Sequence, residues 1–231
     1  MTEPTLLIVG ASRGLGLGLA SEFLARGWRV IGTVRSGSRT PLHDLAETCA
    51  GRLIVETLDI NSADETDALL ERLVSQTLDM LFVNAGTTNE EPDTPVGDVS
   101  VDVFQHVMLT NTFAPMRVIE ALQHLVPASG LIGVMSSGQG SIANNEVGLR
   151  EVYRCSKAAL NMAMRSFAAR EKDASRALLT LAPGWIRTDL GGADAPYTLE
   201  DSLPILADII EGKRQRPGLE YLDRFGKVVP W

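Results

Sequence analysis

The 231-residue sequence is 45% hydrophobic and 22% charged, a balance typical of a folded globular protein and not of a disordered chain. Its formal net charge of −8, without a basic cluster, excludes a nucleic-acid-binding surface, because phosphate backbones recruit lysine and arginine. No apolar stretch approaches the ~18 residues of a membrane span, and the first residues lack the basic segment of a signal peptide. We therefore expect a cytoplasmic protein with neither a nucleic-acid partner nor a membrane partner.

Cysteine and histidine are few and dispersed. Cys49, Cys155, His43, His106 and His124 show neither the spacing of metal ligands nor that of a disulfide framework. The sequence therefore predicts no metal site.

Short apolar runs alternate with helical stretches along the chain. Strands are predicted at residues 5–9, 29–34, 53–58, 80–83, 131–135 and 178–181, and residues 226–231 are a candidate for a short last strand. Helices are predicted from Leu15 until Gly27 stops the first one, and then near 62–75, 100–126, 149–171 and 198–211. This alternation implies right-handed crossovers and a parallel sheet. We predict one α/β domain over residues 1–231, a Rossmann-type doubly wound parallel sheet with helices on both faces.

A glycine-rich turn directly follows the first predicted strand. The segment Gly10-Ala-Ser-Arg-Gly14-Leu-Gly16 opens the next helix. Glycines in such a turn let backbone N–H groups approach a pyrophosphate, and the helix dipole favours its negative charge. The spacing differs from the common Gly-x-Gly-x-x-Gly fingerprint, and a plain tight turn is the alternative interpretation. The position between a strand and a helix favours a dinucleotide-binding site.

The end of the second predicted strand bears on the choice of dinucleotide. NAD-binding folds place Asp or Glu there, against the ribose hydroxyls, whereas here Arg35 follows Val34. Arg35, together with Arg13 in the glycine turn, can pair with a 2′-phosphate from two sides. We therefore predict NADP as the cofactor. The alternative is that both arginines are solvated surface residues.

Tyr153 and Lys157 stand four residues apart in a strongly helical segment and share one helix face. A cation beside a phenol favours the phenolate, so we expect Lys157 and an oxidised nicotinamide to lower the pKa of Tyr153. Taken alone, this spacing is usually a surface pair. Upstream, however, Ser136 and Ser137 follow a predicted strand at its carboxyl end, where open α/β sheets place their ligand sites. This context favours Tyr153 as a catalytic acid and base.

Seven motifs in chain order give the sequence a resemblance to the short-chain dehydrogenase/reductase family over nearly its whole length. They are Gly10-x-x-x-Gly14-x-Gly16, Asp59-Ile60, Asn84-Ala85-Gly86, Asn111, Ser137, Tyr153-x-x-x-Lys157 and Pro183-Gly184-Trp185-Ile186-Arg187-Thr188. The resemblance implies an oxidoreductase that transfers a hydride between NADP(H) and a carbonyl or alcohol substrate.

The resemblance also implies a role for each catalytic residue. Tyr153 would give and take the substrate proton, and Ser137 would polarise the carbonyl oxygen. Lys157 would bind the nicotinamide ribose and lower the pKa of the tyrosine. Asn111 would hold a water molecule in the proton relay.

The expected cofactor contacts come from the glycine turn, the strand ends and the segment after residue 182. They are Gly10, Ser12, Arg13, Gly14, Leu15, Gly16, Arg35, Asp59, Ile60, Asn84, Ala85, Gly86, Tyr153, Lys157, Pro183, Gly184, Ile186 and Thr188. By the resemblance, Asp59 would meet the adenine and residues 84–86 would border its ribose. Ile186 and Thr188 would contact the carboxamide side of the nicotinamide.

Within the family, residues 183–192 and the ending 227–231 resemble the small carbonyl reductases related to the sniffer and C-factor proteins. Two departures from the family pattern stand out. Val9 replaces the usual threonine before Gly10, which implies the loss of one hydrogen bond near the turn. The segment from Ser137 to Tyr153 is longer than the commonest spacing, which implies a larger loop over the substrate pocket.

Two other functional classes share parts of this pattern. Extended epimerases and dehydratases also carry Tyr-x-x-x-Lys, but the residues after Pro183 are too few for their substrate domain. The other alternative is a catalytically idle NADP-binding sensor or signalling protein on the same fold, because function belongs to the site and not to the fold. The presence of Asn111, Ser137, Tyr153 and Lys157 argues against it.

The sequence does not identify the carbonyl or alcohol substrate. We expect the pocket walls to come from residues 87–95, 139–150 and 188–200. Trp185, Leu190 and Tyr197 suggest an apolar lining, although packing of Trp185 into the core is an alternative. The helical stretches 100–126 and 149–171 are candidates for a homodimer face, with a monomer as the alternative.

Overall fold

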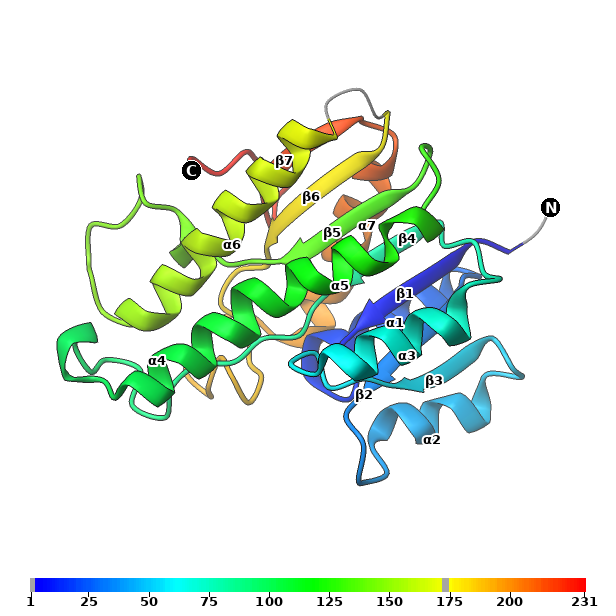
Figure 1. Ribbon diagram of the computed structural model, residues 1–231, viewed down its shortest axis with the longest axis horizontal. Helices are drawn as coiled ribbons and strands as arrows, with labels where there is room; N and C mark the ends of the chain where they lie inside the picture. Colours follow the sequence, from blue (N-terminus) through cyan, green and yellow to red (C-terminus); the bar gives the residue numbers. More distant parts are fainter. Residues whose placement is uncertain (1–2, 172–174) are drawn as a thin grey trace.

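The computed structural model describes residues 3–171 and 175–231, and its centre is one seven-stranded sheet (Figure 1). All neighbouring strands run parallel, in the order β3-β2-β1-β4-β5-β6-β7. The strands are β1 (Thr5–Val9), β2 (Arg29–Val34), β3 (Leu53–Thr57), β4 (Met80–Val83), β5 (Leu131–Met135), β6 (Ala177–Ala182) and β7 (Gly218–Asp223). The order reverses between β1 and β4, which is where doubly wound sheets open a ligand crevice at the carboxyl ends of their strands.

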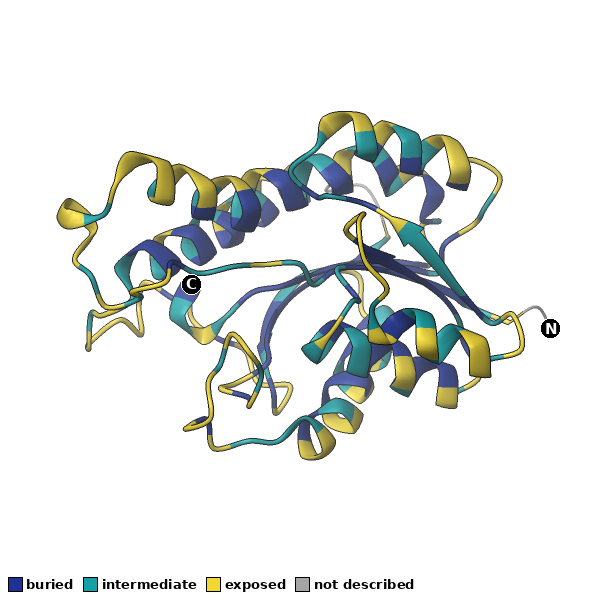
Figure 2. Ribbon diagram, turned by 90° about the horizontal axis from the view of Figure 1, so that it is seen from below, coloured by how far each residue is buried: buried dark blue, intermediate teal, exposed yellow. Residues whose placement is uncertain are grey.

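Helices cover both faces of the sheet, so that its strands lie buried between two layers (Figure 2). Side chains of α1 (Gly14–Ala25), α2 (Pro41–Thr48) and α7 (Leu199–Arg214) pack with one face of the sheet. Side chains of α3 (Ala63–Leu73), α5 (Ala114–Leu122) and α6 (Glu151–Arg170) pack with the other face. The predicted α/β architecture is confirmed.

The long helical stretch expected at 100–126 contains a break in its regularity. It consists of α4 (Val101–Met108), a π-helical turn at Leu109–Phe113, α5 and a final 3₁₀ turn at Gln123–Leu125. A π-helical turn widens the helix by one residue and is frequent at functional sites. Here it carries the buried Asn111.

The secondary structure differs from the prediction in two places. Helix α2 was not predicted, because it has eight residues and buries only Leu42. The last strand is β7 at Gly218–Asp223 and not the segment 226–231, which folds back so that Val228 pairs antiparallel with Leu222. In the edge strand β7 only Tyr221 and Leu222 are buried, and Glu220 interrupts the apolar residues, so the strand lacks the continuous apolar run of the other strands.

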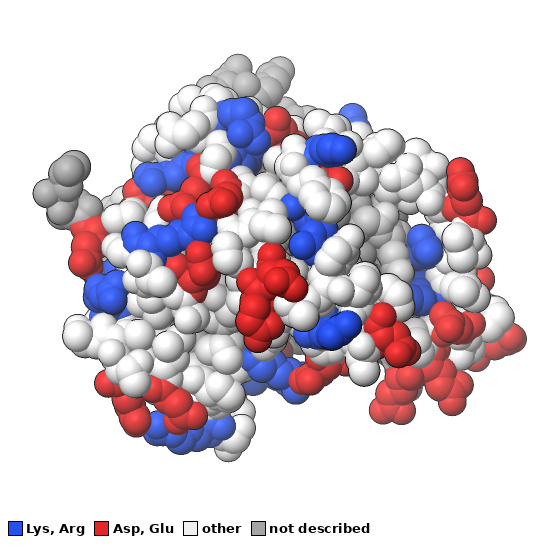
Figure 3. All heavy atoms as spheres, turned by 180° about the vertical axis from the view of Figure 1, so that it is seen from behind, with Lys and Arg blue, Asp and Glu red and all other residues white. Residues whose placement is uncertain are grey.

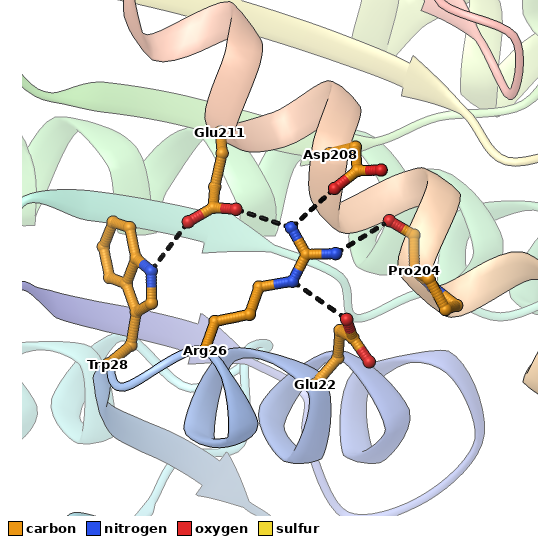
Figure 4. Close-up of polar contacts among 6 residues, drawn as sticks. All are labelled: Glu22, Arg26, Trp28, Pro204, Asp208 and Glu211. Carbon is orange, nitrogen blue, oxygen red and sulfur yellow. Dashed lines mark hydrogen bonds and ion pairs between the residues drawn. The ribbon is translucent and has the colours of Figure 1, made fainter.

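Helices α1 and α7 are joined by one arginine. The guanidinium of Arg26 donates to Glu22 at 2.9 Å, to Asp208 at 2.7 Å and to Glu211 at 2.6 Å. Figure 4 shows the whole cluster, which consists of Glu22, Arg26, Trp28, Pro204, Asp208 and Glu211. Arg26 follows the last residue of α1, so the contact ties the C-terminal end of α1, away from the glycine turn, to α7.

The surface carries acidic and basic side chains side by side. On the face seen in Figure 3, the two kinds are interspersed. Some oppositely charged side chains of the protein form ion pairs, such as Arg26–Asp208. Among the helices that the structure describes, none combines the length and apolar character needed to cross a bilayer.

Candidate active site

A cavity of 710 Å³ opens at the carboxyl ends of β1, β2, β4, β5 and β6. Most of the residues expected to bind the cofactor or to take part in catalysis line it together. They are Gly10, Ser12, Arg13, Gly14, Leu15, Arg35, Asp59, Ile60, Asn84, Ala85, Gly86, Ser137, Tyr153, Lys157, Pro183, Gly184, Ile186 and Thr188. Two expected residues, Gly16 and Asn111, do not line the cavity.

The glycine turn is shaped by close backbone packing. Gly10 has a φ of +85°, and a Cβ there would lie 2.8 Å from the Cβ of Ala85. Gly16 lies beneath the turn, where a Cβ would lie 2.0 Å from the Gly10 carbonyl oxygen. The role of Gly16 is therefore packing between helix and strand, and its distance from the cavity follows from that role. Asn84 donates from Nδ2 to the same Gly10 carbonyl at 2.8 Å.

The start of α1 is suited to an anion. Its first turn holds no acidic residue, and Arg13 at the N-cap provides no side-chain cap. The first N–H groups of a helix have no partner within the helix, and an anion at this end also gains from the helix dipole. Gly10 N donates to Thr33 Oγ1 at 2.9 Å, so that Thr33 on β2 supplies a side-chain hydrogen bond at the turn that follows Val9.

Two arginines stand at the end of the cavity near the glycine turn and β2. Arg35 is exposed and directly follows β2, whereas Arg13 forms an exposed ion pair with Asp189 at 3.2 Å. Both line the cavity. Asp59 also lines it, and its carboxylate accepts a hydrogen bond from Asn61 N at 2.9 Å. These groups can hold a phosphate on the ribose and the polar edge of a base.

Tyr153, Ser137 and Lys157 converge at the opposite end of the cavity. Tyr153 is 7% exposed and belongs to the first turn of α6, whereas Ser137 follows β5. Lys157 Nζ donates to the Met135 carbonyl at 2.9 Å and lies 5.8 Å from the centroid of the Tyr153 ring. The shared helix face thus brings lysine and tyrosine to one cavity, with the lysine directed to the end of β5.

Burial dominates the acid–base properties of both groups. Burial raises the pKa of Tyr153 above its usual 10.0, while a side-chain hydrogen bond with Ser137 and the positive charge of Arg150 act in the opposite direction. Burial also lowers the pKa of Lys157 from 10.5 to about 8. In the protein alone, desolvation of the phenol thus outweighs its neighbouring charges, and the lowering of the tyrosine pKa by Lys157 together with an oxidised nicotinamide stays a prediction.

Asn111 lies behind the cavity and connects three segments. Its Oδ1 accepts from Thr87 N at 2.8 Å, and its Nδ2 donates to the Thr87 carbonyl at 2.8 Å and to Ser156 Oγ at 2.9 Å. Ser156 in turn donates to the Tyr153 carbonyl at 2.7 Å. The amide of Asn111 thus ties the loop after β4 to the turn of α6 that carries the tyrosine. A role in a proton relay stays a prediction.

The structure adds polar residues that the sequence patterns did not single out. Gln139 and Arg150 line the cavity, and the Arg150 guanidinium carbon lies 5.1 Å from the Tyr153 ring centroid. Tyr221 on β7 donates from its hydroxyl to the Ser137 carbonyl at 2.5 Å. The three-residue spacing of Arg150 and Tyr153 gave no signal of the first contact, because Arg150 precedes α6 in a left-handed conformation and the i,i+3 relation holds only within a helix.

The loop after β6 forms an apolar wall of the cavity. Trp185 is 51% exposed and lines the cavity with Leu190, while its Nε1 donates to the Gly191 carbonyl at 2.6 Å. Trp185 is therefore not a core residue. Tyr197 does not line the cavity; its ring stacks under the buried Arg224 at 3.5 Å instead.

Comparisons with known proteins agree with this geometry. The family model described as short chain dehydrogenase matches residues 4–196. A short-chain dehydrogenase/reductase from Burkholderia multivorans, solved with bound NADP, is 56% identical, with a TM-score of 0.98 and 100% of both chains covered. The C-signal protein of Myxococcus xanthus is 33% identical over 156 residues, which are 67% of this chain and 93% of C-signal. The carbonyl reductase Sniffer of D. melanogaster is 27% identical, with a TM-score of 0.88 and 100% of both chains covered.

Proposed function

The chain belongs to the short-chain dehydrogenase family, and from this premise we propose that it is an NADP-dependent oxidoreductase acting on a carbonyl or alcohol. The observation that carries the proposal is the convergence of Tyr153, Ser137 and Lys157 in the cavity that the glycine turn also lines. The resemblance to the sniffer and C-factor proteins is confirmed by the similarity to Sniffer and to C-signal.

NADP fits the residues at the glycine-turn end of the cavity. The uncapped start of α1 suits the pyrophosphate, and Arg35 and Arg13 suit a 2′-phosphate because guanidinium groups pair with phosphate through charge-assisted bonds. No acidic residue occupies the end of β2, where an NAD enzyme carries one. The similarity to a protein solved with NADP supports the same assignment.

The chemistry divides between the cofactor and the chain. NADP supplies or accepts the hydride when it is bound. In our proposal, Tyr153 donates its phenolic proton to the substrate oxygen during reduction and takes it back during oxidation. Ser137 donates to the same oxygen and so polarises the carbonyl, while Lys157 binds the nicotinamide ribose. Asn111 acts beside them by fixing α6 and by holding the relay water.

The raised pKa of Tyr153 bears on the direction of the reaction. A phenol with a pKa above 10.0 is protonated at neutral pH, which is the form that carbonyl reduction needs. Oxidation needs the phenolate, and that form requires additional positive charge near the ring. Together with the similarity to the carbonyl reductase Sniffer, the neutral phenol supports our proposal that the chain reduces carbonyl compounds.

The testing experiment is the Tyr153→Phe variant. It should keep its affinity for NADPH but lose carbonyl reduction by about 10²- to 10⁴-fold, because the proton donor at the substrate oxygen is removed. Tyr197→Phe is the matched control, since it removes a hydroxyl outside the cavity lining. NADPH consumption with a panel of aldehydes and ketones measures the turnover, and calorimetry measures the binding. Turnover above a few per cent of wild type would refute the role of Tyr153.

A catalytically idle NADP-binding sensor or signalling protein is the second candidate. The observation in its favour is the similarity to a protein named C-signal. If the protein is such a sensor, it binds NADPH, but wild type and Tyr153→Phe consume the carbonyls of the panel at the same rate. The same assay therefore separates the two functions.

Three further assignments belong to this proposal. Residues 1–231 act as one NADP-binding domain, the protein works in the cytoplasm, and its partner is a second copy of the chain. Exposed apolar side chains on α4, on the π-helical turn and on α6 support the dimer, among them Val101, Phe113 and Met162. Light scattering of the wild type and of Phe113→Glu measures the mass, and a monomeric wild type would contradict the dimer.

A further inference from the structure

Arg150 occupies an unusual position beside the catalytic tyrosine. Three consecutive residues, Gly148, Leu149 and Arg150, have positive φ values of 70°, 49° and 54°. Such values cost free energy in a leucine or an arginine, and they persist where the surrounding structure over-determines them, often at functional sites. The result of this backbone course is that Arg150 directly precedes α6 and its side chain reaches the ring of Tyr153.

The other cations of the cavity are engaged or belong to its far end. Arg13 pairs with Asp189, and Lys157 donates to the Met135 carbonyl. Arg35 stands at the end of β2, where the 2′-phosphate is proposed. Arg150 is nearer the phenol ring than Lys157, at 5.1 Å from its centroid against 5.8 Å, and no hydrogen bond to a carbonyl holds its guanidinium among the described residues. Among the described residues, its buried Nε has no hydrogen-bond partner, and no carboxylate forms an ion pair with it.

Gln139 presents a second unsatisfied group on the same cavity wall. Its Oε1 is buried and has no hydrogen-bond partner among the described residues. The Nε of Arg150 is a donor and this oxygen is an acceptor, but no hydrogen bond joins them in the structure, so each is left without a partner. A buried polar group without a partner destabilises the fold, because it has lost its hydrogen bonds to water. A ligand with its own polar groups would remove this destabilisation.

We propose that Arg150 binds a carboxylate of the substrate, so that the carbonyl compounds reduced by this chain are oxo acids. The inference rests on the proposed function, because the cavity end beside Tyr153 is where the substrate must lie. A guanidinium offers several N–H donors in one plane and matches a carboxylate with two parallel hydrogen bonds. In a chain with a net charge of −8, an anionic substrate also needs a local cation to hold it.

The position of Arg150 also limits the shape of the substrate. The guanidinium stacks near the face of the ring whose hydroxyl donates the proton, so the carboxylate must lie only a few bonds from the reacting carbonyl. Gln139 Oε1 is free to accept a hydrogen bond from a hydroxyl or amide on the same compound. The rest of the molecule would face the apolar wall formed by Trp185 and Leu190.

The test compares acids with their neutral esters. The probes are benzoylformate, 3-benzoylpropanoate and 4-oxopentanoate, each with its methyl ester, reduced by NADPH. For at least one pair, Arg150→Met should lower kcat/KM for the acid about tenfold more than for the ester, mainly through KM. Arg150→Lys should recover part of the loss, since it keeps the charge without the planar fork.

The matched control is Arg165→Met. Arg165 belongs to α6, the helix that Arg150 directly precedes, and also stacks on an aromatic ring, that of Trp231, but it does not line the cavity. This variant loses the same charge and the same kind of contact, and it should leave the ratio of acid to ester unchanged. Calorimetric titration of the three acids into the NADP⁺ complex provides a reading that does not depend on turnover.

The outcomes separate this inference from the proposed function. Equal losses for acids and esters, together with a shifted pH profile, would mean that Arg150 acts only on the pKa of Tyr153, and would overturn the inference. Equal affinity of wild type and Arg150→Met for all three acids would overturn it as well. A wild type that binds the acids through Arg150 but reduces none of the six compounds would contradict the proposed function alone.

Discussion

Replacing Lys157 by methionine should change the pH dependence of stability in a calculable way. Lys157 is 3% exposed, and burial lowers its pKa from 10.5 to about 8. At neutral pH the folded protein therefore carries a buried positive charge, whereas the unfolded chain carries the same charge in water. At 1.36 kcal/mol per pKa unit, this difference corresponds to roughly 3 kcal/mol against folding.

The sign of the effect follows from proton binding. Below pH 8 the lysine is protonated in both states, and the whole cost of the buried charge is present. Between pH 8 and 10.5 the unfolded state binds more protons than the folded state, so the wild type gains stability as pH rises. Lys157→Met lacks this group, and its advantage over wild type should shrink by roughly 2.5 kcal/mol between pH 7 and pH 10. The loss of the hydrogen bond to the Met135 carbonyl changes the difference in free energy of unfolding between variant and wild type by the same amount at every pH.

Urea unfolding followed by tryptophan fluorescence at pH 7, 8, 9 and 10 measures both free energies of unfolding. Lys227→Met is the control, because it removes a lysine that is exposed. A difference between Lys157→Met and wild type that stays constant across this range would refute the reasoning. The same variant should reduce carbonyls far more slowly, which would make Lys157 a residue retained for activity at a cost in stability.

Three further variants test the cofactor assignment, the contact between α1 and α7, and the support of the serine. Arg35→Asp should lower kcat/KM with NADPH by at least about tenfold while changing that with NADH little, whereas equal losses would contradict phosphate recognition. Arg26→Met should lower the free energy of unfolding by ~2 kcal/mol, because the cluster around Arg26 is only partly exposed, and calorimetry should then show a Tm lower by about 4–8 °C. Arg39→Met, whose ion pairs are exposed, should lower Tm less. Tyr221→Phe should lower kcat about tenfold at unchanged KM for NADPH, because Ser137 loses its support; an unchanged kcat would exclude this role.

Most of the fold could be predicted because its strands are short apolar runs and its helices have a clear period. The fully buried strands, such as β1 and β5, read directly from the sequence. The elements at the edge of the sheet were harder, because burial does not impose a continuous apolar pattern there. Helix α2 buries one residue, and β7 is exposed along part of its length, so neither leaves a strong signal.

The cofactor end of the site was predictable for a related reason. Its residues directly follow strands, and the carboxyl ends of parallel strands meet at one edge of the sheet. Arg35 after β2 and Ser137 after β5 could thus be placed in one cavity from sequence order alone. Asn111 was found by resemblance, but its place behind the cavity depends on the π-helical turn, which no pattern of apolar residues specifies.

The substrate end depends on contacts between segments that are distant in sequence or have special backbone conformations. Tyr221 reaches Ser137 across 84 positions, because β7 pairs with β6. Arg150 reaches the phenol through three positive φ values that its own sequence does not favour.

The balance of charge around Tyr153 depends on contacts that the spacing of Tyr153 and Lys157 does not specify. The i,i+4 relation places Lys157 on the same helix face, but the chain directs its ammonium to the Met135 carbonyl and leaves the guanidinium of Arg150 nearer the ring. Burial then favours the neutral phenol, the form that donates a proton. A carboxylate bound to Arg150 would neutralise the charge that favours the phenolate and would stabilise the proton donor further. Binding of an oxo acid would thus hold Tyr153 in the protonation state that its reduction requires.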